Sequence, residues 1–163
     1  MQYMKKLIKY IIPLIAAGIL IFIDQFTKYL VDFNMDLYDF YPVIQDVFEI
    51  RYIQNSGTAW GLFAGMNMHI FFVIMTIFLM AVMVYAYVKL SAHRQYLPLN
   101  ITLVILFAGA IGNMIDRIRL HYVIDFLYFK LINFPVFNVA DIYVVVGMFM
   151  LAYLILFRYK DEV

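Results

Sequence analysis

The sequence contains no cysteine, only three histidines, and 14% charged residues among its 163 positions. Without cysteine the chain has no disulfide framework, no thiolate nucleophile and no thiolate metal site. The histidines lie far apart along the chain, so we expect no metal site and no cofactor. The formal net charge is only +1 and the basic residues are scattered, which argues against nucleic acid as a partner. Any chemistry must therefore come mainly from carboxylates.

Hydrophobic residues, in contrast, make up 66% of the chain, far more than a soluble domain usually contains. Four runs are long enough, or nearly so, to cross a bilayer, which needs about 20 residues. We expect these spans at about residues 10–33, 69–89, 95–116 and 140–157. The predicted fold class is all-α transmembrane: a four-helix membrane bundle forming one domain over residues 1–163.

The first run could open a cleaved signal peptide, because basic residues precede it. Where a cleavage site would need small residues, the chain instead reads DQFTKYLV over residues 24–31 and continues the helical pattern. We therefore expect this span to be retained. Basic residues also lie between the second and third spans and after the fourth, so the positive-inside rule predicts cytoplasmic N and C termini.

The two remaining connections, about residues 34–68 and 117–139, then face outward. The first is too long for a plain connector. Residues 48–52 alternate apolar and polar side chains, which is typical of a half-buried strand. We expect a small β-sheet cradle on the outer membrane surface.

Ionisable residues inside an apolar span are costly, so each is a functional hypothesis. Asp24 and Lys28 lie four residues apart on one helix face and can form an ion pair. For Lys28 we favour a side chain that reaches to the membrane interface. Asp116 and Arg117 end the third span, where we expect a local ion-pair network with a structural role.

A stripe of small and polar residues marks the third span: Gly109, Asn113 and Asp116 lie at i, i+4 and i+7, with Gly112 beside them. For the two glycines the favoured interpretation is close helix packing. At the start of the fourth span, Asn138 precedes an aspartate by three residues. This spacing is typical of a capping box, and taken alone it needs no other explanation.

The acidic residues of three spans lie at a similar expected depth in the membrane. With about 1.5 Å of rise per residue, Asp24, Asp116 and Asp141 each lie about 22–33 Å from the basic residues at the cytoplasmic ends, near the outer face. Asp125 lies in the outer connection between two of the spans. Paired carboxylates in a low-dielectric site cannot both ionise cheaply, so one keeps a proton. This is the requirement for general acid and base action on water.

Five motifs then occur in order: DQFTK at 24–28, NSGTAWG at 55–61, GNMIDR at 112–117, VIDF at 123–126 and FNVAD at 137–141. Together they resemble the bacterial lipoprotein signal peptidases, or signal peptidase II, over nearly the whole chain. The resemblance implies an aspartic endopeptidase in the bacterial cytoplasmic (inner) membrane, with its active site near the outer face. The implied substrate is a diacylglyceryl-modified prolipoprotein, cut before the lipidated cysteine. We expect a monomer, surrounded by membrane lipids.

By position, the resemblance implies that Asp125 and Asp141 are the catalytic pair and that Asn113 and Asn138 orient the pair or the substrate. One departure is His121, where the family commonly has glycine, which tolerates a positive φ far better. Another is the segment IYVVVG after the second aspartate, where a small polar residue is more usual. Roles in supporting the site or binding substrate are predicted for Asp24, Lys28, Asn55, Gly57, Ala59, Trp60, Gly61, Gly109, Asp116, Arg117 and Ala140.

Two other classes of protein stay open on the residues alone. A proton or cation pathway could use Asp24, Asp116 and Asp141, but it would need ionisable groups in the cytoplasmic half, where the second and third spans have none. A noncatalytic membrane assembly subunit would explain the glycines and leave the aspartate pair without a purpose.

Overall fold

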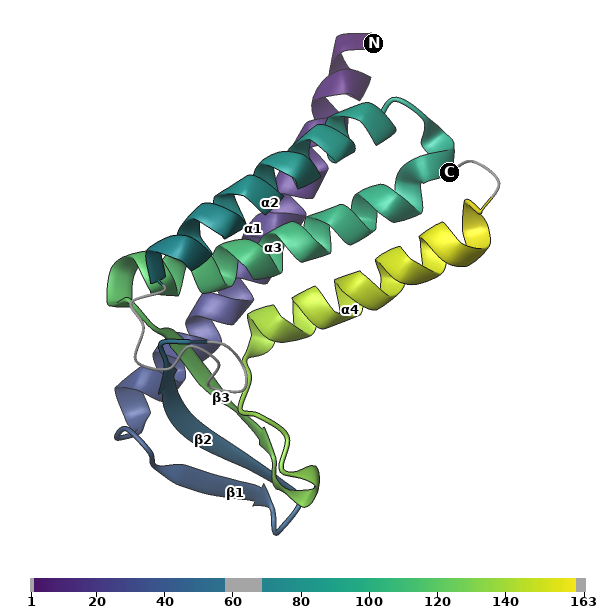
Figure 1. Ribbon diagram of the computed structural model, residues 1–163. Helices are drawn as coiled ribbons and strands as arrows, with labels where there is room; N and C mark the ends of the chain where they lie inside the picture. Colours follow the sequence, from purple (N-terminus) through teal and green to yellow (C-terminus); the bar gives the residue numbers. More distant parts are fainter. Residues whose placement is uncertain (1, 58–68, 161–163) are drawn as a thin grey trace.

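The computed structural model describes residues 2–57 and 69–160. Four long helices lie side by side, and a three-stranded sheet lies at one end of them (Figure 1). The helices are α1 (Gln2–Asn34), α2 (His69–Leu90), α3 (Leu97–Leu120) and α4 (Val139–Tyr153), which continues as the π-helical segment η3 (Leu154–Arg158). The strands are β1 (Phe40–Ile44), β2 (Phe48–Asn55) and β3 (Val123–Phe129), and two short 3₁₀ turns are η1 (Arg94–Tyr96) and η2 (Lys130–Ile132).

The four predicted spans are confirmed as helices. Stretches long and apolar enough to cross a membrane run over Lys9–Asn34, Ile70–Leu90, Arg94–Leu120 and Val139–Arg158. Large apolar side chains on the outside of the bundle are exposed, as lipid-facing helices require. Helix α1 passes through residues 24–31 without interruption, as its sequence predicts.

Helix α3 extends beyond the predicted end of the third span at residue 116. It continues to Leu120 because arginine favours a helix and its charge suits a helix C-terminus. His121 then caps the helix in the left-handed conformation, with φ of 67°, and its N–H donates to the carbonyl of Arg117 at 3.2 Å. Histidine therefore still forms this left-handed turn, which glycine would form at a lower energetic cost.

The sheet has the antiparallel order β1-β2-β3. The strand predicted at 48–52 is confirmed within β2, whereas β3 was expected to be part of a connection. Residues 123–126 are all buried, so the strand lacks the alternation that marks a half-buried one. Val31 of α1 packs with Tyr52, Ile124 and Phe126, which fixes the sheet against the first helix.

After β3 the chain folds back along the same strand. The carbonyl of Phe137 accepts hydrogen bonds from the N–H groups of Phe126 at 2.9 Å and Leu127 at 2.8 Å. Asn133 turns the backbone with φ of 49°, and Pro135 lies in the return, where a continuous helix was excluded. The return places the start of α4 beside the middle of β3.

A proline inside α1 creates one contact between α1 and α2. Pro13 has no N–H, so the carbonyl of Lys9 loses its helical partner. The hydroxyl of Tyr87 in α2 donates to this carbonyl at 3.0 Å. Both helices otherwise pack mainly on α3.

Candidate active site

Asp125 lies in β3 with 3% of its surface exposed, and both of its carboxyl oxygens accept hydrogen bonds. Asn138 Nδ2 donates to Oδ1 at 2.6 Å, and Asn55 Nδ2 of β2 donates to Oδ2 at 2.8 Å. Strand pairing between β2 and β3 places Asn55 near the aspartate, and the return of the chain brings Asn138. The carboxyl group is thus held in one orientation from two sides.

Asp141 lies in the first turn of α4 and completes the predicted capping box. Asn138 Oδ1 accepts from the backbone N–H of Asp141 at 2.9 Å, and Asp141 Oδ2 accepts from the backbone N–H of Asn138 at 3.1 Å. The other oxygen, Oδ1, accepts from Asn113 Nδ2 of α3 at 2.8 Å. This carboxylate has two donors and a helix N-terminus beside it, which all favour a negative charge.

Asn138 connects the two aspartates, since its side chain binds Asp125 and its backbone binds Asp141. The elements β3 and α4 thus bring together two acids that are 16 positions apart in the chain. Burial raises the pKa of Asp125, the negative charge of Asp141 raises it further, and the value reaches about 7. Below about pH 7 Asp125 therefore holds a proton.

The side chain of Lys28 is buried, with only 1% exposed, and does not reach the interface as predicted. Its ammonium group donates to three acceptors: Asp24 Oδ2 at 3.0 Å, Asp116 Oδ2 at 2.9 Å and Asn113 Oδ1 at 3.0 Å. The predicted ion pair between Asp24 and Lys28 is confirmed. The interface position is wrong because one acceptor on α1 and two on α3 satisfy all three protons of the ammonium inside the bundle.

Asp116 does not pair with Arg117 in the way the sequence suggested, because adjacent helical residues do not face each other. The ion pair of Asp116 is with Lys28, whereas Arg117 Nη1 donates to the carbonyl of Asn113 at 3.4 Å and its guanidinium lies over the ring of Phe72 at 5.2 Å. The negative charges of both candidate aspartates act on Arg117. The carboxylate of Asp116 acts on it as well, but more weakly than that of Asp141.

The two glycines of α3 allow the helices to approach closely, as expected. A Cβ at Gly112 would lie 2.5 Å from Asp24 Oδ2, and one at Gly109 would lie 2.6 Å from the carbonyl oxygen of Ala140. Ala140 is fully buried at this contact, and its N–H donates to Asp24 Oδ1 at 2.8 Å. Asp24 therefore helps to cap α4, which orients the turn that carries Asp141.

Of the predicted residues in the first outer connection, Asn55 and Gly57 lie at the site. The N–H of Gly57 donates to Asn55 Oδ1 at 3.0 Å, which leaves the amide Nδ2 directed to Asp125. The predictions for Ala59, Trp60 and Gly61 lie outside the described residues.

Sequence reasoning missed Gln25, whose Nε2 donates to Asp116 Oδ1 at 2.9 Å and to the carbonyl of Gly112 at 3.1 Å. The signal was its place beside Asp24 in the motif DQFTK. Within residues 2–57 and 69–160, no three histidine, aspartate or glutamate side chains are grouped as ligands for a metal ion.

The chain is similar to known proteins over most of its length. A sequence profile of the family described as Signal peptidase (SPase) II matches residues 16–157. The lipoprotein signal peptidase of Caldanaerobacter subterraneus subsp. tengcongensis is 42% identical over 146 residues, covering 89% of this chain and 96% of the relative. That of Geobacter sulfurreducens is 40% identical over 133 residues, covering 80% and 82%.

A solved structure described as a bacterial membrane enzyme superposes with a TM-score of 0.81 at 29% identity, covering 94% of this chain and 92% of that one. Four helices able to span a membrane and a membrane-enzyme neighbour of nearly full length identify a multi-pass membrane protein. The family profile and the relatives assign the chain more closely: it belongs to the signal peptidase II family.

Proposed function

We propose that Asp125 and Asp141 are the catalytic pair with which this aspartic peptidase of the signal peptidase II family removes lipoprotein signal peptides. The observation that carries the proposal is the connection of the buried Asp125 to the half-buried Asp141 through Asn138, together with the pKa of about 7 for Asp125. One acid holds a proton while the other is ionised, as hydrolysis by a general acid and base requires.

Asp141 is the ionised member and acts as the base. Its oxygens accept from Asn113 and from the backbone of Asn138, and the N-terminus of α4 favours its negative charge. It takes a proton from water while the water oxygen attacks the scissile carbonyl. Asp125 is the protonated member, and its O–H donates to the carbonyl oxygen, on which negative charge develops. The proton on Asp141 then passes to the leaving amine as the C–N bond breaks.

The buried ion cluster of Asp24, Lys28 and Asp116 positions the groups that carry out this chemistry. Lys28 donates to Asn113 Oδ1, so the Nδ2 of the same amide is directed to Asp141. Asp24 holds both Lys28 and the first turn of α4. No metal ion or cofactor is needed for the proposed reaction.

The substrate we propose is a prolipoprotein whose cysteine already carries diacylglycerol, with cleavage directly before that cysteine. The signal peptide helix and the acyl chains are lipid-soluble, so they can reach the pair by lateral diffusion between the helices. In this scheme the protein is a monomer in the bacterial inner membrane with both termini cytoplasmic, and the sheet and the pair lie at the outer face. Positive charges at the end of the bundle opposite the sheet support this orientation. A proton pathway or an assembly subunit is not favoured.

Two experiments test the substrate and the orientation. A lipidated precursor should be cleaved much faster than the same precursor without the lipid, and equal rates would overturn the proposed recognition. Because the chain lacks cysteine, single cysteines can report on orientation. Asp36→Cys should react with a membrane-impermeant maleimide in spheroplasts, whereas Ser91→Cys should react only after lysis. The reverse pattern would contradict the proposed topology.

A further inference from the structure

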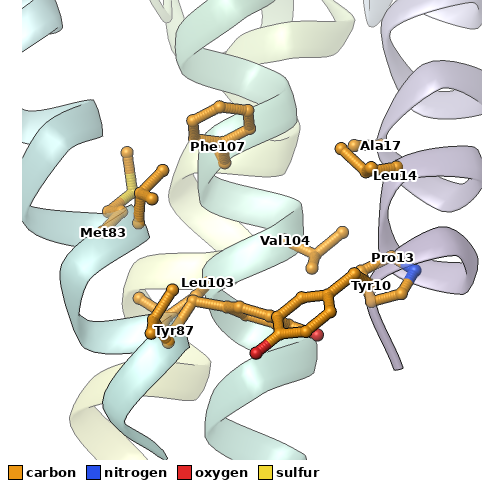
Figure 2. Close-up of a pocket in the computed structure, with 11 residues that line it drawn as sticks. Tyr10, Pro13, Leu14, Ala17, Met83, Tyr87, Leu103, Val104 and Phe107 are labelled. Carbon is orange, nitrogen blue, oxygen red and sulfur yellow. The ribbon is translucent and has the colours of Figure 1, made fainter. Parts of the chain in front are cut away.

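An apolar cavity lies between α1, α2 and α3 (Figure 2), in the half of the bundle that lies away from the sheet in Figure 1. Its volume is about 200 Å³, and Leu14, Met83 and Phe107 are among its lining side chains. None of the residues that line it belongs to the candidate active site. Because α1 and α2 pack mainly on α3, the space between them is filled by neither helix.

A second pocket of about 330 Å³ adjoins the first, since Pro13 and Tyr87 line both. It lies at the ends of the helices and is basic, with Lys9 and Arg94 in its wall. In the part of the chain that the structure describes, neither of these two side chains forms an ion pair with a carboxylate. The pocket therefore offers two positive charges beside an apolar cavity.

Asn100 of α3 also lines the second pocket and is 7% exposed. Its Oδ1 has no hydrogen-bond partner among the described residues. A buried acceptor is costly to leave unpaired, so such a group in a pocket indicates a missing donor. The two pockets together reach the size of a small-molecule site, about 300–1,000 Å³.

We propose that the two pockets form one binding site for an anionic glycerophospholipid, phosphatidylglycerol. One acyl chain fills the apolar cavity between α1 and α2. The phosphate lies between Lys9 and Arg94, and a hydroxyl of the glycerol headgroup donates to Asn100 Oδ1. Basic pockets at the ends of membrane helices bind anionic headgroups in this way. Phosphatidylcholine fits poorly, because its headgroup has no donor and would bring a third cation to the pocket.

Native mass spectrometry of the purified protein in detergent tests the site, using phosphatidylglycerol and phosphatidylcholine with identical acyl chains. Phosphatidylglycerol should bind more tightly. Loss of one basic side chain should weaken its binding about fivefold, and Lys9→Gln with Arg94→Gln about thirtyfold. Lys89→Gln is the matched control, because this lysine lies near the same end of the bundle outside both pockets. Equal binding of the two lipids, or equal loss in the control, would overturn the proposal.

Asn100→Leu provides a second test that does not remove charge. Without phosphatidylglycerol, the variant should melt no lower than the wild type, since the substitution removes an unpaired acceptor. With the lipid, the upward shift in melting temperature should be smaller than in the wild type. A full shift would overturn the assigned contact and with it the site. Cleavage of a lipoprotein precursor in phosphatidylcholine should be unchanged in all these variants.

Discussion

Replacing the buried Lys28 by methionine should destabilise the protein strongly. Methionine keeps most of the volume and removes the charge, so Asp24 and Asp116 lose the ammonium group that lies 3.0 Å and 2.9 Å from their oxygens. Breaking a buried ion pair by removing one partner costs about 3–5 kcal/mol, because the remaining charge is left uncompensated. An exposed ion pair would cost about 0–1 kcal/mol. Since native proteins have only about 5–15 kcal/mol of stability, the loss is readily measured.

The assay is the melting temperature of the purified protein in detergent, together with denaturant titration where unfolding is reversible. Lys28→Met combined with Asp116→Asn removes one charge of each sign and should recover part of the loss. Lys89→Met, at the end of α2, is the control and should stay within about 0.5 kcal/mol of the wild type. A loss below about 1 kcal/mol for Lys28→Met, or no recovery in the double variant, would refute the buried cluster.

Three further predictions concern the pair, the helix contact and the glycine. Because the pKa of Asp125 is raised to about 7 in the folded protein, folding favours its neutral form. Between pH 4 and pH 8, the free energy of unfolding of the wild type should therefore fall by about 4 kcal/mol relative to that of Asp125→Asn. Cleavage should also decline above pH 7. If urea titrations gave the same difference in unfolding free energy between the wild type and Asp125→Asn at every pH, this prediction would be contradicted. Tyr87→Phe should lower the stability measured by thermal unfolding by about 1–3 kcal/mol, because it leaves the carbonyl of Lys9 unpaired. The loss should be much smaller in a Pro13→Ala background, where a backbone N–H replaces the hydroxyl as donor. Equal losses in both backgrounds would exclude the contact. Gly112→Ala puts a methyl group 2.5 Å from Asp24 Oδ2 and should lower kcat and cost about 1–3 kcal/mol, whereas Gly18→Ala, where a Cβ meets nothing within 4 Å, should not destabilise.

The sequence predicted the parts of the fold that depend on local pattern. Four spans follow from apolar length, and the box formed by Asn138 and Asp141 follows from the preference of a helix N-terminus for these side chains. Strand β3 was missed because a strand buried on both faces has no alternation. The positions of such segments depend on their partners, which a local pattern does not contain.

The candidate site was predictable in composition and less so in its pairing. The depth of Asp24, Asp116 and Asp141 placed acids in one layer, and the motifs added Asp125. The partner of Lys28 on α3 could not be predicted, because the contact joins residues 88 positions apart and depends on close packing at Gly112. For the same reason Asp116 was assigned to its neighbour in sequence instead of its neighbour in space.

The most direct test of the central claim is cleavage of a diacylglyceryl-modified prolipoprotein by wild type, Asp125→Asn and Asp141→Asn, followed as a gel mobility shift. Each substitution nearly preserves the shape of the side chain and removes only its ability to titrate. Wild type should cut before the lipidated cysteine, and both variants should be folded but inactive. Near wild-type turnover in either variant would contradict the paired-aspartate mechanism.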